Sequence, residues 1–212
     1  MGLLKIIKAA LNNRTSSQLY TDRIWVSESA KFAGLGKHIL ESPASHRIWV
    51  LAHFEESLNE IKAALDELNV SYDEAHSAQD LQHSNSEVLV TRAATVEEHR
   101  SLPFPSAKAP DIVFVIEHYP TFGRDDELVV KLKEISPENQ VYYYVALSEP
   151  FFNNKLLKIE TTFEQFNISE DECLEHPWLT KSIRNAQQRI AREAGNAVPA
   201  NSQEEWFDNN LS

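Results

Sequence analysis

Residues 47–72 read RIWVLAHFEESLNEIKAALDELNVSY, a short apolar run followed by a longer periodic one. The run at 47–52 is apolar almost without interruption, as expected of a strand that is buried on both faces of a parallel sheet. In the second part, apolar side chains recur at three- and four-residue spacing: Leu58, Ile61, Leu65 and Leu68. This is the spacing of one helical face, so the stretch predicts a buried strand followed by an amphipathic helix.

The same alternation extends in both directions from this unit. Short apolar or β-branched runs predict further strands at 22–26, 70–72, 88–90, 112–116 and 141–147. Ser27 is a suitable cap for a helix that ends near Pro43. The segment 93–110 contains three prolines and little periodicity, so we expect a loop or a partly helical excursion there. Crossovers of these lengths predict an α/β fold: a mostly parallel sheet flanked by helices.

The two ends of the chain differ from this central part. A helical face of five apolar residues begins after Pro177: Leu179, Ile183, Ala186, Ile190 and Ala194. Gly195 and Pro199 are expected to end that helix. We therefore expect three parts: an amphipathic helix at 1–14, an α/β domain at 22–150, and a helical extension with a polar tail at 151–212. The tail is polar apart from Trp206, Phe207 and Leu211.

The chain is acidic, with 32 Asp and Glu against 20 Lys and Arg and a net charge of −12. Nucleic-acid binders need clustered cations, so we expect no general nucleic-acid binding. The one cysteine, Cys173, lies among carboxylates that disfavour a thiolate, and we interpret it as inert. No apolar run approaches the roughly 20 residues needed to span a bilayer, and residues 1–14 do not read as a signal peptide. We expect a cytoplasmic protein.

Motifs for nucleotides and metals are weak in this sequence. A P-loop needs a glycine-rich turn that ends in Gly-Lys-Ser/Thr after a strand. The nearest approach, Gly34-Leu35-Gly36 followed by Lys37, lies inside a helical pattern instead. None of the eight histidines has HxH, HExxH or HxxxH spacing, and no cysteine pair supports a zinc site. We therefore predict no metal site and no cofactor.

Polar residues gather where predicted parallel strands end, which is the edge where open α/β sheets bind ligands. We predict a candidate ligand or partner edge made of seven residues: His53, Glu55, Arg92, Glu117, His118, Arg124 and Asp125. For the two histidines, a surface or capping role is the favoured interpretation. Glu55 and Asp125, with their acidic neighbours, are interpreted as residues of first helical turns, where the dipole favours carboxylates. Arg124, Asp125 and Asp126 are predicted to be the most exposed.

Four stretches, which together span roughly residues 22–193, carry a family resemblance. They read DRIWVSESAKF, RIWVLAHFEESLNEIKAALDELNVSY, IVFVIEHYPTFGRDDEL followed by VYYYVALSEPFF, and FNISEDECLEHPWLTKSIRNAQQRIARE. In the family's order, they resemble the second nucleotide-binding, RecA-like domain of the SecA preprotein-translocase motor and the start of its scaffold helix. Residues 1–14 also look like the family's N-terminus. The resemblance implies a RecA-like fold and a connection with protein translocation.

The departures from the family pattern concern its chemistry. A glycine- and aspartate-containing motif that faces the nucleotide is replaced by VTRAATVEEHRS, and an arginine-rich run is replaced by ELVVKLKEISPEN. Arg124 is out of register with those arginines. Lys131 and Lys133 are poor substitutes for a planar, bidentate donor. Since such an arginine is worth ~10³–10⁵ in rate, and the P-loop domain is absent from this sequence, we do not expect the chain to hydrolyse ATP alone.

Several hypotheses of function remain open from the sequence. The favoured one is a non-catalytic protein-interaction module, with self-association as one form of it. The alternative is half of a composite ATPase, in which Arg92 or Arg124 approaches a nucleotide held by a partner's P-loop. A third is weak peripheral membrane contact through residues 3–11. The last is an enzyme of new chemistry that uses the strand-end residues His53, Glu55, Glu117 and His118.

Overall fold

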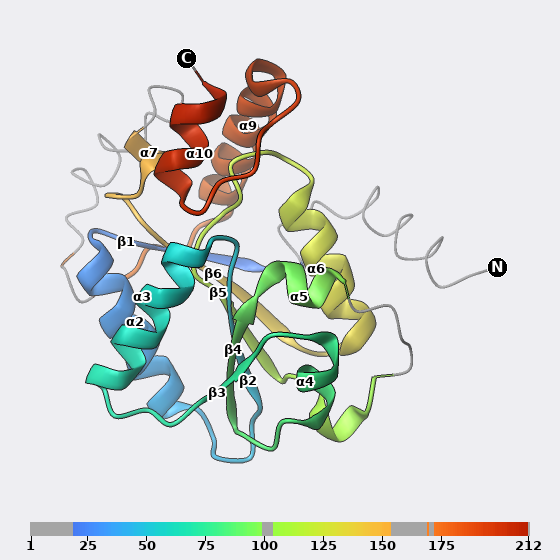
Figure 1. Cartoon of the computed structure of the whole chain (residues 1–212). Coiled ribbons are helices and arrows are strands. Elements are labelled where there is room, and N and C mark those ends of the chain that lie inside the picture. Colours follow the sequence, from blue (N-terminus) through green and yellow to red (C-terminus); the bar gives the residue numbers. More distant parts are fainter. Residues whose placement is uncertain (1–18, 99–103, 154–168, 170–171, 212) are drawn as a thin grey trace.

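A computed structural model describes residues 19–98, 104–153, 169 and 172–211. Six strands form one sheet in the order β1-β6-β5-β2-β4-β3, and every neighbouring pair is parallel (Figure 1). The strands are β1 (Thr21–Trp25), β2 (Ile48–Ala52), β3 (Asp73–Ala75), β4 (Val88–Arg92), β5 (Ile112–Val115) and β6 (Gln140–Ala146). The predicted α/β class is confirmed. The helices predicted at 1–14 and the membrane contact at 3–11 lie outside the described residues.

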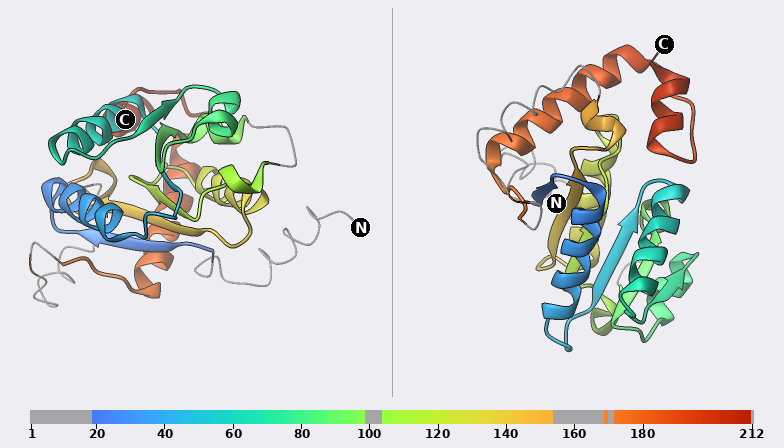
Figure 2. Two further views of the ribbon diagram at one scale, coloured as in Figure 1. Left: turned by 90° about the horizontal axis from the view of Figure 1, so that it is seen from below. Right: turned by 90° about the vertical axis from the view of Figure 1, so that its left-hand side faces the viewer.

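Helices cover both faces of the sheet and its carboxyl end (Figures 1 and 2). One face is covered by α2 (Glu28–Glu41) and α3 (Glu55–Glu67), and the other by α4 (Ala78–His83), α5 (Ala93–Glu97) and α6 (Arg124–Ile135). A short 3₁₀ helix, η2 (Ser106–Lys108), precedes β5. The C-terminal extension consists of α7 (Pro150–Asn153), α9 (Pro177–Ala194) and α10 (Gln203–Asn210) in its described part. The helical extension and the partly helical excursion are thus both observed.

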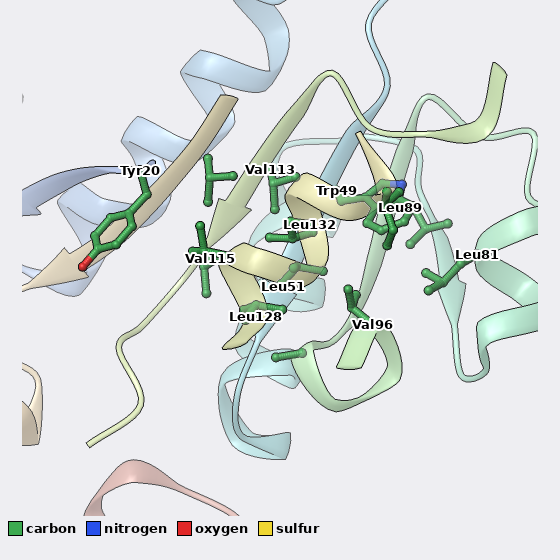
Figure 3. Packing of buried hydrophobic residues seen from close by; sticks show 14 of the residues in the cluster. Tyr20, Trp49, Leu51, Leu81, Leu89, Val96, Val113, Val115, Leu128 and Leu132 are labelled. Carbon is green, nitrogen blue, oxygen red and sulfur yellow. The ribbon is translucent and has the colours of Figure 1, made fainter. Parts of the chain in front are cut away.

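Strand β2 is the centre of the core. All five of its residues are buried, as its continuous apolar run predicts. Because side chains alternate along a strand, Trp49 and Leu51 enter the cluster beneath α6, while Val50 enters the cluster beneath α2 and α3. Figure 3 shows the first cluster, where Leu128 and Leu132 of α6 lie near Leu51 and Val115. The sheet is therefore a two-sided core that holds the strand ends in fixed positions.

Two predictions about elements need correction. The strand predicted at 70–72 lies at 73–75, because the chain first has to close α3: Asn69 adopts φ 55° and the N–H of Val70 donates to the carbonyl of Leu65 at 2.9 Å. The tail, predicted to be polar, contains helix α10. Its Trp206 is fully buried in a third apolar cluster with residues of α7 and α9.

The helix predicted after Pro177 is confirmed, since α9 begins at that residue. The chain leaves this helix at Gly195, whose φ of 57° suits a residue without a side chain. Gly34 and Gly36 lie inside α2, as the helical pattern indicated, and not in a phosphate-binding turn after a strand. Within the described residues, no helix is long and apolar enough to cross a membrane.

Gly34 is expected to be the less replaceable of these two glycines. A Cβ there would overlap the indole carbons Cζ2 and Cη2 of Trp25, which is buried against Tyr144. We expect Gly34→Ala to lower the free energy of unfolding by about 1–3 kcal/mol through overpacking, despite the higher helix propensity of alanine. Gly36→Ala is the matched control, because its Cβ would meet only the end of the half-exposed Leu68 side chain. Urea denaturation measures both, and equal effects would contradict the packing argument.

Candidate functional site

The strand order places a topological switch point at the carboxyl ends of β2 and β5. After β2 the chain runs through α3 towards the β4–β3 side of the sheet, and after β5 it runs through α6 towards β6. Open α/β sheets bind ligands at such a switch point. Here the first residues beyond β2 are His53 and Phe54, and those beyond β5 include Glu117 and His118. The predicted site residues therefore meet at one edge of the sheet.

The carboxylate of Glu117 occupies the N-terminus of α3. Its Oε1 accepts hydrogen bonds from the backbone N–H groups of His53, at 2.8 Å, and Phe54, at 3.0 Å. Its Oε2 accepts from the hydroxyl of Ser57 at 2.7 Å. A helix N-terminus with free N–H groups is a ready-made site for a phosphate. In this protein a buried carboxylate of the chain itself takes that position.

His118 is fully buried between two carboxylates. Its Nε2 lies 2.9 Å from Oδ1 of Asp22, and its Nδ1 lies 2.7 Å from Oδ2 of Asp125. The ring stacks on Tyr143, with centroids 4.3 Å apart. Burial alone would lower the pKa of His118, but Asp22 and Asp125 outweigh it and raise that pKa to about 10. The side chain is therefore an imidazolium at neutral pH, with both nitrogens donating.

Asp125 connects this cation to the rest of the edge. In addition to His118, it accepts hydrogen bonds from the N–H of Tyr119 at 3.1 Å and from the amide of Gln187 at 2.6 Å. Its Oδ1 also lies 3.0 Å from Nε2 of His53. Burial would raise the pKa of Asp125, but the His118 cation holds it well below the usual range. The carboxylate is thus ionised and saturated with donors.

Several predictions about exposure are wrong at this edge. Asp125 was expected to be exposed but is 3% exposed, because the first turn of α6 directs it to the His118 cation. Its neighbour Asp126 stays at the surface, where it pairs with Arg184 at 2.7 Å. A surface or capping role was favoured for the two histidines, and the surface role is wrong because His53 and His118 are both buried. The carboxylates of α3 and α6 do lie in first helical turns, as predicted.

The C-terminal helices lie across the carboxyl end of the sheet (Figure 1). Gln187 of α9 donates to the carbonyl of Tyr119 at 2.8 Å, and Gln203 of α10 donates to the carbonyl of His118 at 3.1 Å. The N–H of Glu56 donates to the carbonyl of Asn201 at 3.1 Å. Trp206 packs edge-on against the ring of Tyr119, with centroids 6.1 Å apart. The extension is therefore bonded directly to residues at the carboxyl edge of the sheet.

The remaining site residues lie on the rim of a small depression. Arg92 pairs with Glu55 at 2.8 Å and donates to the carbonyl of His53 at 2.9 Å. Arg124 pairs with Glu97 at 2.8 Å. The depression has a volume of about 100 Å³, and nine residues line it: His53, Phe54, Arg92, Ala94, Glu97, Tyr119, Arg124, Pro199 and Ala200. The seven predicted residues thus divide into a buried network and a paired rim.

Sequence reasoning missed a buried ion pair beside this network. Lys31 of α2 lies 2.7 Å from Glu149, and both side chains are buried. The same Glu149 oxygen accepts from the N–H of Ala146 at 2.9 Å. Burial raises the pKa of Glu149 to about 7, although Lys31 acts in the opposite direction. The signal was present for Lys31, which falls on the apolar face of its helix next to Ala30 and Leu35.

Asp22, Gln187 and Gln203 were also missed, and they lie in segments far from His118 in the sequence. The described residues contain no group of three or more His, Cys, Asp or Glu side chains arranged to hold a metal ion. Cys173 is half-buried, and burial raises the pKa of its thiol, which keeps it protonated at neutral pH. The chemistry available at this edge is therefore that of charged, hydrogen-bonded side chains and two rim arginines.

No protein-family model matches this sequence, and comparison with curated proteins gave no match. Among solved structures, the chain is similar to one in the crystal structure of the E. coli DEAD-box protein SrmB bound to regulator of ribonuclease activity A (RraA). That likeness has a TM-score of 0.46 and 16% identity, and covers 63% of this chain and 81% of that chain. The crystal structure of the C-terminal part of the Fun30 ATPase domain gives a TM-score of 0.44 and 10% identity, over 91% and 64% of the two chains. The observed sheet is consistent with the predicted RecA-like domain, and these likenesses carry no conclusion about activity.

Proposed function

We propose that this protein is a non-catalytic, cytoplasmic interaction module: a RecA-like domain related to the SecA motor that binds a protein partner connected with translocation. The observation that carries the proposal is the position of Glu117. Its carboxylate accepts hydrogen bonds from the N–H groups of His53 and Phe54, the two residues before α3, at 2.8 and 3.0 Å, in the region where a helix N-terminus can bind a phosphate. A second anion at that place would meet a buried negative charge.

The size and pairing of the rim support the same proposal. Sites for small molecules are typically about 300–1,000 Å³ in volume. The depression beside His53 and Tyr119 has about 100 Å³. Both of its arginines already hold carboxylates at 2.8 Å, Arg92 with Glu55 and Arg124 with Glu97. A nucleotide would have to break these pairs and displace the C-terminal residues Pro199 and Ala200, which line the same depression.

The resemblance to the SecA family comes from the sequence, and it suggests protein translocation as the process in which the partner takes part. The four stretches between residues 22 and 193 follow the family's order, while its glycine- and arginine-rich motifs are replaced. A domain that keeps its core and loses its chemistry retains surfaces, and surfaces are sufficient for binding a protein. We therefore favour a partner from protein translocation over a small-molecule ligand.

Calorimetric titration with ATP and Mg²⁺ tests the proposal directly. We expect no heat beyond that of dilution at micromolar nucleotide, because the N–H groups of His53 and Phe54 are already bonded to Glu117. An intact P-loop ATPase titrated in the same buffer is the positive control. Micromolar binding accompanied by phosphate release would contradict the proposal.

One observation favours a second candidate function, half of a composite ATPase. Arg92 and Arg124 lie on the same depression at the carboxyl edge, where a partner's nucleotide would approach them. In that case the chain would raise the ATPase rate of a P-loop partner from protein translocation, and Arg124→Ala would abolish the increase. An unchanged rate with the wild-type chain argues against this candidate.

A further inference from the structure

Helix α9 presents an outward surface, on the side away from the carboxyl edge of the sheet. Its inner face is fixed in the core through four buried apolar residues: Leu179, Ile183, Ala186 and Ile190. On the opposite side, exposed residues recur at three- and four-residue spacing: Trp178, Lys181, Asn185, Arg189 and Arg192. We call these five residues the α9 stripe. Because the inner face is packed, the stripe is held in a constant orientation on the outside of the molecule.

The charges of the α9 stripe have no partners. In the described part of the chain, the side chains of four lysines and arginines make no hydrogen bond or ion pair: Lys37, Lys181, Arg189 and Arg192. Three of these four belong to the stripe. By contrast, Arg184 on the flank of the same helix is bound to both carboxylate oxygens of Asp126, at 2.7 and 2.9 Å. Although the net charge of the protein is −12, three of the four unpaired cations among its described residues thus lie on one helix face.

Aromatic surface accompanies these cations. Trp178, at the start of the stripe, is 45% exposed, and Phe122 beside the helix is 38% exposed. Phe122 is held to α9 by Arg184, whose guanidinium lies 4.8 Å from its ring centroid. Tryptophan and arginine are the residues most enriched where binding energy concentrates in protein interfaces. The stripe therefore combines an apolar anchor with three free positive charges.

We propose that the α9 stripe is the docking surface for an acidic segment of a partner protein, with an apolar residue that covers Trp178. This inference rests on the proposed interaction function and assigns it to a surface separate from the carboxyl edge. Carboxylates spaced along the segment would pair with Lys181, Arg189 and Arg192. The complementary charge would also speed association and weaken it at high salt.

A short acidic segment fits better than an extended polyanion. A nucleic acid or an anionic membrane extends well beyond the length of one helix face, and would meet the acidic remainder of the molecule. Helix α10, which packs in the same apolar cluster as α9, exposes Glu204, Glu205 and Asp208. Three cations also neutralise only about three phosphates, which gives weak nucleic-acid binding at physiological salt. A peptide that contacts only the stripe avoids this repulsion.

The test uses the full chain and a displayed library of random peptides. The peptides are long enough to span the α9 stripe, which covers about four turns of the helix. We expect the selected peptides to be rich in Asp and Glu, with an apolar residue at a constant position. Fluorescence anisotropy of a selected peptide then measures affinity for the chain and for the variant K181E/R189E/R192E. Reversing three exposed charges is expected to weaken binding about ten-fold or more. The matched control is Lys37→Glu, which reverses the unpaired cation on α2 and is expected to leave the affinity unchanged.

Several outcomes would overturn the assignment. These are selected peptides without excess acid, equal loss of affinity in Lys37→Glu, and no loss in the triple variant. Tighter binding to single-stranded RNA or to phosphatidylglycerol vesicles, lost in the triple variant, would replace the proposed partner class. Dimerisation in analytical ultracentrifugation that the triple variant abolishes would do the same. None of these readouts depends on nucleotide, so they separate failure of this surface from failure of the proposed function.

Discussion

Replacing Asp125 by alanine is expected to lower the free energy of unfolding by about 3–5 kcal/mol, because it leaves a cation buried without its partner. His118 is fully buried, and its Nδ1 lies 2.7 Å from Asp125. The variant also removes the acceptor for the N–H of Tyr119 and the amide of Gln187. Urea denaturation at neutral pH measures the loss.

The neighbouring residue gives a matched control. Asp126 sits one position further along α6 and pairs with Arg184 at 2.7 Å, with both side chains about a fifth exposed. Ion pairs that water reaches contribute about 1 kcal/mol or less, so Asp126→Ala is expected to have a small effect. Similar losses for the two variants would contradict the argument from burial.

The pH dependence of stability provides an independent reading of the same pair. The pKa of His118 is about 10 in the folded protein, against about 6.5 in an unfolded chain. A raised folded pKa means that the contribution is fully present below about pH 6.5 and is lost as the pH rises towards 10. The wild-type protein should therefore lose stability between pH 7 and 10, and His118→Gln should flatten that slope. A slope unchanged by the substitution would mean that His118 is not the titrating group.

The sequence predicted those parts of the fold that depend on local patterns. Strand β2 is buried on both faces because its apolar run is continuous, and α9 begins at Pro177 because its apolar face starts there. Strand β3 was misplaced, since closing α3 at Asn69 takes precedence over the β-branched and aromatic residues that follow. Helix α10 was missed because a helix of eight residues offers few periods, and only Trp206 carries its packing.

The buried network could not be predicted from such patterns. His118 is bonded to the carboxylate of Asp22, which is 96 residues away in the sequence. Asp125, the second partner of His118, is bonded to Gln187 of α9, which is 62 residues from Asp125. Each of these residues reads locally as an ordinary polar residue, and only the sheet order brings them together. The position of Asp125 shows the competition clearly. The helix dipole favours a carboxylate in the first turn of α6. Asp125 points inward because its carboxylate pairs with the buried imidazolium of His118.

The position of Glu117 connects the fold to the proposed absence of nucleotide binding. A phosphate-binding edge needs free N–H groups at a helix N-terminus and cations that can reach an anion. Here the N–H groups of His53 and Phe54 are bonded to Glu117, and the imidazolium of His118 is enclosed by carboxylates. The same residue types that would bind a ligand are used to attach the C-terminal helices to the sheet. The edge is part of the buried interior, and for this reason we assign the proposed interaction to an outward surface, the α9 stripe.

The second large effect is expected for Lys31→Met, which should lower the free energy of unfolding by up to about 3–5 kcal/mol at alkaline pH, where Glu149 would be ionised without its partner. The substitution keeps the volume of the side chain and removes the cation that lies 2.7 Å from the buried carboxylate of Glu149. In the double variant K31M/E149Q the uncompensated charge is gone, so most of the loss is expected to be recovered. Lys62→Met is the control at a surface pair, where Lys62 lies 3.2 Å from Glu74 and water reaches both groups.

The loss in Lys31→Met should also grow with pH, because burial already raises the pKa of Glu149 to about 7 in the wild-type protein. The pKa of a glutamate in an unfolded chain is about 4.3. A carboxyl whose folded pKa is higher therefore destabilises the protein as the pH rises above the unfolded pKa. Without Lys31 the folded pKa rises further, and the gap between wild type and variant widens from about pH 6 to 9, where Glu149 of the wild type becomes ionised. Urea denaturation across this range measures the gap. A loss that is constant with pH, or equal to that of Lys62→Met, would mean that the pair is not the buried charge contact described here.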